Sequence, residues 1–269
     1  MHYTTLALII LLGSLALCLL PVFFGMLRKK IATPQVPMFP EKGFPALWEQ
    51  LLALFFFLIY TGATALPLLS DSAGYTSREP LSTLELVSSL ASQILIYLPL
   101  IILCIVRLPW RPETHIGLKR LVAWLFLALA AIIIPSQILE SMGFLQYVAE
   151  QTGSPLYQDV IYHIAQGSTG TRILLIIMAV IVAPLAEECC FRGILYNILK
   201  HWGGAIPAML ASALLFSAVH VALPQAVPLF LFGMVQCMAY ERAKTLWLPI
   251  AIHAVFNALS VLCVLILFT

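Results

Sequence analysis

Residues 171–199 read TRILLIIMAVIVAPLAEECCFRGILYNIL. A transmembrane helix needs about 20 mostly apolar residues, and this stretch has that length and composition. Two adjacent carboxylates, Glu187 and Glu188, and the guanidinium of Arg192 nevertheless lie within it. A charge at mid-membrane costs roughly 2.5–3.5 kcal/mol on insertion scales, so charged residues there are rare and are usually functional. The stretch therefore predicts both a spanning helix and a buried polar site.

The composition of the whole chain supports a membrane setting. Of its 269 residues, 62% are hydrophobic and 10% are charged, against about 25% charged residues in soluble domains. Its mean hydropathy is +1.01. Because water cannot solvate such a surface, the lipid bilayer is the expected solvent. The net charge of +2 gives no basic patch of the kind that binds nucleic acid.

Hydropathy divides the chain into eight candidate spans. They cover about residues 3–27, 46–69, 84–108, 121–139, 171–199, 204–222, 226–241 and 245–268. The predicted fold is all-α, a polytopic transmembrane bundle of about eight helices that forms a single integral membrane domain over residues 1–269. Between the fourth and fifth spans, residues 140–170 are expected to form a loop with a short surface helix.

The distribution of charge predicts the orientation. The first apolar run is too long for a signal peptide and has no basic residues before it, so we expect a retained helix. Eight spans with an external N-terminus place most cations on one side, which the positive-inside rule makes cytoplasmic. These cations are Arg28, Lys29, Lys30, Lys42, Arg107, Arg111, Lys119, Arg120, Lys200, Arg242 and Lys244, with only Arg78 and Arg172 on the other side.

The acidic pair divides into two predicted roles. Glu188 and Arg192 are four residues apart and share a helix face, so they can form an ion pair. Glu187 is rotated by about 100° from Glu188 and needs a partner on another helix, a proton or water. Pro184 removes a backbone hydrogen bond just before the pair and favours a kink. The alternative interpretation is that all three charged residues form a packing network between helices.

Three more polar residues lie within the late spans. His220 follows Phe216 near the end of the sixth span, and His253 and Asn257 share one face of the eighth. Measured from the cytoplasmic ends at about 1.5 Å per residue, Glu187, His220, His253 and Asn257 lie at depths of roughly 20, 24, 13 and 19 Å. One layer near mid-bilayer can hold all four. Each could instead be a polar packing contact between helices.

This set of side chains suits hydrolysis. A carboxylate beside an imidazole can act as a general base on water, and two side-chain donors can stabilise an oxyanion. Geometry alone does not choose which histidine has which role. The sequence has neither Gly-x-Ser-x-Gly nor His-Glu-x-x-His, so a serine hydrolase elbow and a zincin are not indicated. The six cysteines lie in apolar stretches and are expected to be packing residues, with a thiol nucleophile at Cys189 or Cys190 as an alternative.

Two further alternatives stay open. Glu187, His220 and His253 could ligate Zn²⁺ in a metalloprotease, since one carboxylate and two histidines form a known catalytic set. Intramembrane Glu and His also serve proton relays, so a transporter, or a non-catalytic scaffold or immunity protein, is the other possibility.

Glu187-Glu188-x-x-x-Arg192, Phe216-x-x-x-His220 and His253-x-x-x-Asn257 resemble the three motifs of the CAAX protease and bacteriocin-processing family of intramembrane glutamic endopeptidases, which is related to the CAAX prenyl endopeptidase. The resemblance covers about residues 170–260, a motif-bearing core, and the helices in residues 1–140 have none of it. It extends to Phe191-Arg192-Gly193, to Gly233 and to Leu246-Trp247-x-Pro249.

The resemblance implies a role for each residue. Glu187 and His220 would activate water, His253 and Asn257 would form the oxyanion hole, and Glu188 and Arg192 would support them. It implies no metal or other cofactor, and a substrate that is a prenylated protein C-terminus or a peptide leader. Short loops and the lack of appended domains favour a bacterial inner membrane.

Overall fold

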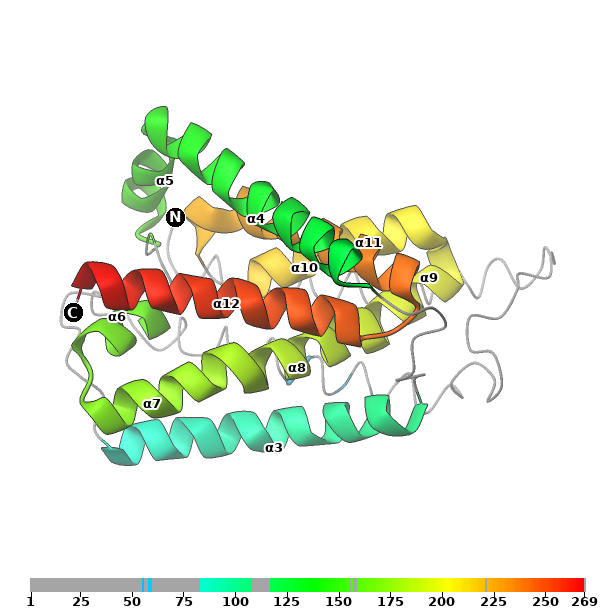
Figure 1. The fold of residues 1–269 in the computed structure, drawn as a ribbon, viewed down its shortest axis with the longest axis horizontal. Helices are drawn as coiled ribbons and strands as arrows, with labels where there is room; N and C mark the ends of the chain where they lie inside the picture. Colours follow the sequence, from blue (N-terminus) through cyan, green and yellow to red (C-terminus); the bar gives the residue numbers. More distant parts are fainter. Residues whose placement is uncertain are drawn as a thin grey trace.

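The computed structural model describes residues 83–107, 117–154, 156, 159–220 and 222–268, together with three isolated positions, Phe55, Leu58 and Ile59. The predicted spans at 3–27 and 46–69 lie outside the described residues. Every secondary-structure element in the described part of the chain is a helix, so the predicted all-α class is confirmed. Figure 1 shows several long helices side by side along the longest axis, with α4 crossing them obliquely.

Four helices within the described ranges are long and apolar enough to cross a membrane. They are Leu118–Ser141, Thr169–His201, Leu223–Ala243 and Trp247–Leu267. The first is helix α4 (Leu118–Ser141), the third contains α11 (Ala226–Ala243), and the last is most of α12 (Trp247–Phe268). They correspond to the predicted spans at 121–139, 171–199, 226–241 and 245–268. A fifth predicted span is helix α3 (Thr83–Arg107), of which Leu90–Val106 is apolar.

The sixth predicted span is shorter than expected. Helix α10 (Ala205–Val219) has 15 residues and is therefore about 22 Å long, less than the ~30 Å of the hydrocarbon core. Gly204, at φ 88°, breaks the preceding helix in a conformation that favours glycine. His220 is the C-cap residue directly after α10. The predicted range 204–222 was too long because hydropathy continues past this helix end.

The segment between the fourth and fifth spans holds two short helices, α5 (Phe144–Thr152) and α6 (Asp159–Gln166). The sequence predicted a loop with one short surface helix here. This prediction is wrong for α6, which packs against other helices. Ile164 and Ala165 of this helix are buried in a small apolar cluster with Leu175 and Val264. Helix α6 packs on α7 and α12, so this segment belongs to the bundle.

The stretch that begins at Thr169 is a continuous helix with two wider turns. It runs through α7 (Thr169–Ile177), the π segment η1 (Met178–Val182), α8 (Ala183–Glu188), the π segment η2 (Cys189–Leu195) and α9 (Tyr196–Gly203). Every residue from 186 to 199 is buried, and most of them lie in the main core with side chains of α3, α10 and α11. Helices at the periphery instead expose large apolar side chains, such as Leu95 at 73% and Phe126 at 69%. Lipid is the solvent that suits such a surface.

Candidate active site

The acidic pair lies at the end of a six-residue α-helical segment between two π segments. Glu187 and Glu188 are the last residues of α8, and η2 follows at once. Side chains from neighbouring helices satisfy carbonyls of η2: the Cys104 thiol donates to the Cys189 carbonyl and the Ser212 hydroxyl to that of Phe191. Wide turns of this kind often occur at functional sites. Here they place two adjacent carboxylates at the centre of the bundle.

Glu188 is completely buried and is the acceptor of a polar network. Its Oε1 atom lies 3.0 Å from Arg192 Nη1, so the ion pair that their spacing predicts is present. The same oxygen accepts from Gln236 Nε2 at 3.2 Å and lies 2.8 Å from His253 Nδ1. Three donors therefore compensate the burial of Oε1, whereas Oε2 is buried without a hydrogen-bond partner among the described residues.

Arg192 ties this network to the next helix. Its Nη2 atom donates to the Gly233 carbonyl at 3.1 Å, and its guanidinium carbon lies 4.6 Å from the ring centroid of Phe216, within cation–π range. Both Arg192 and Glu188 are inaccessible to solvent. The pair therefore links α8, η2, α10 and α11 in the core.

Glu187 points toward both histidines. Its Oε2 atom lies 3.7 Å from His220 Nε2 and 3.9 Å from His253 Nε2. Both distances exceed a direct hydrogen bond, and Oε2 is buried without a hydrogen-bond partner among the described residues. The structure thus brings Glu187, His220 and His253 together, and leaves one carboxylate oxygen free to interact with a water or a substrate group.

His220 has a defined tautomer. Its Nδ1 atom lies 2.6 Å from the Phe216 carbonyl, and a carbonyl oxygen can only accept a hydrogen bond. Nδ1 therefore carries the proton, and Nε2 of the neutral ring is an acceptor. Nε2 faces Glu187 Oε2, which is an acceptor too when ionised. The two lone pairs repel each other. A proton on one of the two atoms, or a water that donates a hydrogen bond to each of them, removes this repulsion.

His253 is held by Glu188 and by two aromatic rings. Glu188 Oε1 accepts from its Nδ1 atom, and its ring makes edge-type contacts with Phe216 and Phe232 at centroid distances of 5.9 and 5.3 Å. The side chain is only 4% exposed. The imidazole is therefore fixed, with Nε2 directed to the Glu187 side.

Asn257, one turn along α12, lines the same space but makes a different contact. Its Nδ2 atom donates to the Ala179 carbonyl of η1 at 2.7 Å. The sequence predicts that this amide donates to an oxyanion. In the structure one of its two hydrogens is engaged by the backbone of the long helix.

These residues face a pocket of about 430 Å³. Glu187, His220, His253 and Asn257 all line it, together with side chains of α3, α6, α7, α10, α11 and α12 that include Gln93, Tyr97, His163, Leu175, Phe216, Leu229, Phe232 and Phe256. Within the described ranges, no three His, Cys, Asp or Glu side chains are grouped closely enough to hold a metal ion.

Sequence reasoning missed two contributors. Gln236, which is fully buried, bridges Glu188 and the Pro249 carbonyl. The sequence could have identified it, because an amide side chain within an apolar span costs free energy to bury unless it has a hydrogen-bond partner. His163 lines the pocket from α6, and no signal identified it because residues 140–170 were expected to be a surface loop.

Comparisons with known proteins cover the part of the chain that builds this site. Residues 169–259 match the family model described as type II CAAX prenyl endopeptidase Rce1-like. The chain is 33% identical over 89 residues to the "Putative membrane peptidase YdiL" of Bacillus subtilis (strain 168), which is 33% of this chain and 36% of that protein. It is 35% identical over 99 residues to an "Uncharacterized 24.3 kDa protein" of Escherichia coli, which is 34% of this chain and 44% of that protein.

The aligned region is thus less than half of each relative, and no solved structure matches the chain. The resemblance predicted over about residues 170–260 is confirmed by the family match. That match spans the helix from α7 to α9, then α10, α11 and the first part of α12, and it contains all six of the predicted site residues. Residues 169–259 of this membrane chain, which build the site, are therefore similar to the type II CAAX prenyl endopeptidase Rce1-like family.

Proposed function

We propose that this chain is an intramembrane endopeptidase that hydrolyses a peptide bond with water activated by Glu187 and His220. The observation that carries the proposal is the buried Oε2 atom of Glu187, which has no hydrogen-bond partner among the described residues and lies 3.7 Å from the acceptor nitrogen of His220. A water between them can donate to both atoms, and its oxygen then faces the pocket. A general base of this kind contributes about 10²–10⁴-fold to rate.

The reaction follows from these positions. The water oxygen attacks the carbonyl carbon of the scissile bond while one water proton passes to Glu187 or His220. The carbonyl oxygen becomes an oxyanion, and the same pair then returns a proton to the amine as the C–N bond breaks. The products are a free carboxylate and a free amine, with no covalent enzyme intermediate.

His253 can stabilise the oxyanion in only one protonation state. Because Nδ1 donates to Glu188, a neutral ring has a lone pair at Nε2 and cannot donate there. The imidazolium form has N–H groups at both atoms, so it can donate at Nε2 while Nδ1 keeps its hydrogen bond to Glu188. We therefore assign to Glu188 the role of orienting His253 through Nδ1, in addition to its ion pair with Arg192.

The substrate class follows from the setting. The pocket lies within a bundle whose spans are apolar, so the scissile bond belongs to a peptide or lipidated protein at the bilayer. Prenylated C-termini and peptide leaders are both candidates, and a bacterial inner membrane is the proposed location.

The test begins with substrate discovery and ends with purified protein. Membranes of cells that express wild-type protein or Glu187→Ala are compared for new N- and C-termini by proteomics, and a peptide with the recovered junction is then assayed in detergent. We expect Glu187→Gln to lower kcat by at least ~10²-fold.

Glu241→Gln is the matched control. Glu241 is a half-buried carboxylate of the same bundle that binds Tyr196, Lys200 and Lys244 and lies outside the catalytic pocket. This variant should keep its kcat. Undiminished cleavage by Glu187→Gln would falsify the proposal, and loss of wild-type activity in strong chelator, with recovery on adding Zn²⁺, would favour the metalloprotease instead.

A further inference from the structure

The hydrogen bonds of η1 leave one backbone carbonyl without a backbone donor. In an α-helix the Ala179 carbonyl would accept from the N–H of Ala183. That N–H instead donates to Met178, five residues back, which is the π pattern. The next N–H in a π pattern would come from residue 184, which is proline and has none. Ala179 therefore lacks both its α-helical and its π-helical donor.

Asn257 supplies the missing donor from another helix. Its Nδ2 atom lies 2.7 Å from the Ala179 oxygen in a part-buried setting. This contact also fixes which way the amide faces, since its carbonyl oxygen could not accept from another carbonyl. With one Nδ2 hydrogen held by Ala179, the second hydrogen has a set direction.

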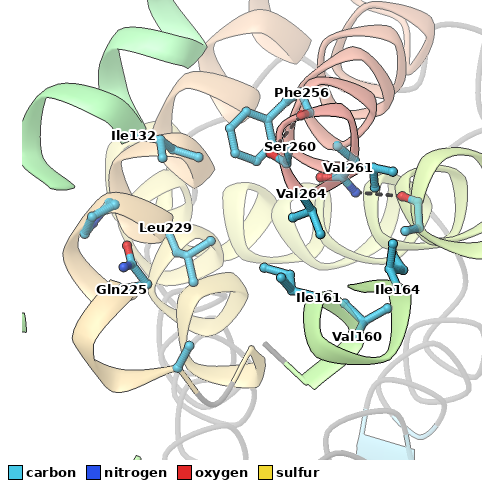
Figure 2. A pocket seen from close by; sticks show the side chains of 14 residues that line it. Ile132, Val160, Ile161, Ile164, Gln225, Leu229, Phe256, Ser260, Val261 and Val264 are labelled. Atoms are coloured by element: carbon cyan, nitrogen blue, oxygen red, sulfur yellow. Dashed lines mark hydrogen bonds between the residues drawn. The ribbon is translucent and has the colours of Figure 1, made fainter. Parts of the chain in front are cut away.

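The contact lies at the wall between two pockets. Ala179 and Asn257 line the catalytic pocket and also a neighbouring apolar pocket of about 180 Å³. Figure 2 shows this second pocket, with Val261 and Val264 of α12 near Ile161 and Ile164 of α6, and draws hydrogen bonds between its lining residues as dashed lines. An amide fixed at this wall presents its free hydrogen beside the space where a substrate carbonyl would lie.

We propose that Pro184, through the carbonyl of Ala179 that it leaves without a donor, is a positioning residue for the Asn257 amide. The proposal rests on the proposed peptidase function, in which Asn257 donates to the oxyanion. Pro184→Ala supplies an N–H that competes for the Ala179 carbonyl. The Asn257 side chain is then released, and its donor is no longer aligned before the reaction.

The first test needs no substrate. The chain has only two asparagines, Asn197 and Asn257, so ¹⁵N-asparagine labelling gives two side-chain amide signals in detergent. Asn197 donates to the carbonyls of Arg192 and Gly193 and is an internal reference. We expect slow hydrogen exchange at both amides in wild type, and at least ~10-fold faster exchange at Asn257 alone in Pro184→Ala.

The second test is kinetic. Pro184→Ala should lower kcat by about tenfold with KM unchanged, because the amide acts on the transition state. Pro135→Ala is the matched control, since Pro135 also lies inside a membrane helix, α4, but lines neither pocket. It should change neither kcat nor the exchange of Asn257.

The outcomes separate the two proposals. Unchanged Asn257 exchange in Pro184→Ala overturns the positioning role, whether or not the protein cleaves peptides. Faster Asn257 exchange in Pro184→Ala, together with a wild-type protein that cleaves nothing, supports the positioning contact and overturns the peptidase. If Pro184→Ala does not fold, the exchange rate of the Asn257 amide in the wild-type protein is the test. Slow exchange supports the proposal, and exchange as fast as that of a free side chain overturns it.

Discussion

At the scale of single residues, the neighbours Glu187 and Glu188 have different surroundings, the pocket for one and a buried polar network for the other. Glu188 faces Arg192, Gln236 and His253, and all three donors reach one of its oxygens. Glu187 faces the pocket and the acceptor nitrogen of His220. The difference follows from the ~100° rotation between neighbouring helix positions.

Glu188→Gln should affect both stability and catalysis. The amide removes the charge that compensates buried Arg192, which should lower the free energy of unfolding by about 3 kcal/mol, seen as a lower Tm in detergent. Adding Arg192→Met should restore part of the Tm but not the activity, because His253 still lacks its carboxylate partner. A stable double variant with wild-type kcat would contradict the role assigned to Glu188.

The residues that line the candidate site stand out in the sequence, whereas their hydrogen bonds could not be predicted from it. Ionisable side chains stand out in an apolar sequence because their burial is expensive, so Glu187, His220 and His253 could be identified. The tautomer of His220 depends on the Phe216 carbonyl one turn earlier, and the amide of Asn257 depends on a helix about 80 residues away. The hydropathy of the sequence predicts neither of these hydrogen bonds.

At the scale of elements, helices α10 and α11 pack at very close range. A Cβ atom added to Gly233 would lie 3.0 Å from both the Cα and the Cβ of Ala213. Small residues allow such approaches between membrane helices. The contact also brings the Gly233 carbonyl within reach of Arg192.

Gly233→Ala should therefore push α10 and α11 apart. We expect a loss of about 1–3 kcal/mol from overpacking, measured as a lower Tm, together with weaker anchoring of Arg192. Gly170→Ala is the control, because it lies in α7 with open space around the added Cβ and should be neutral or slightly stabilising. Equal Tm values for the two variants would contradict the close-packing interpretation.

Element boundaries were predictable where hydropathy and helix ends coincide. Helix α11 begins at the expected residue, and α12 begins within two residues of its predicted position. The range predicted for α10 was too long because apolar residues continue beyond its last residue, Val219. Helix α6 buries Ile164 and Ala165 although its sequence is polar enough for a surface. The widened turns η1 and η2 depend on register, which apolar periodicity does not encode.

At the scale of the whole molecule, most of the described cations gather at one end of the bundle, apart from Arg172 at the start of α7 and Arg192 in the core. Glu241 joins Lys200 of α9 to Lys244, which follows α11, and α4 begins near its own cations Lys119 and Arg120. The turn between α4 and α5 and the start of α7 lie toward the opposite end (Figure 1). The cation-rich end is therefore the predicted cytoplasmic end.

Cysteine labelling in intact cells tests this orientation. In a chain whose native cysteines are replaced, Met142→Cys, at a position 72% exposed after α4, should react with a membrane-impermeant maleimide from outside. Lys244→Cys should react only after the cells are opened, because it lies at the cytoplasmic end. The reverse labelling pattern would show that the bundle is inverted.

The widened turns around α8 have a consequence for how the chain tolerates insertions and deletions. Each π turn closes over one residue more than the α turn that it replaces, so η1 and η2 are equivalent to single-residue insertions in an otherwise regular helix. Deleting one residue between 178 and 182 would convert η1 into regular α turns and keep the acidic pair on its present face, whereas a deletion in a regular α stretch before it would turn the pair by about 100°. The geometry of this site is thus encoded in the number of residues as well as in their identity.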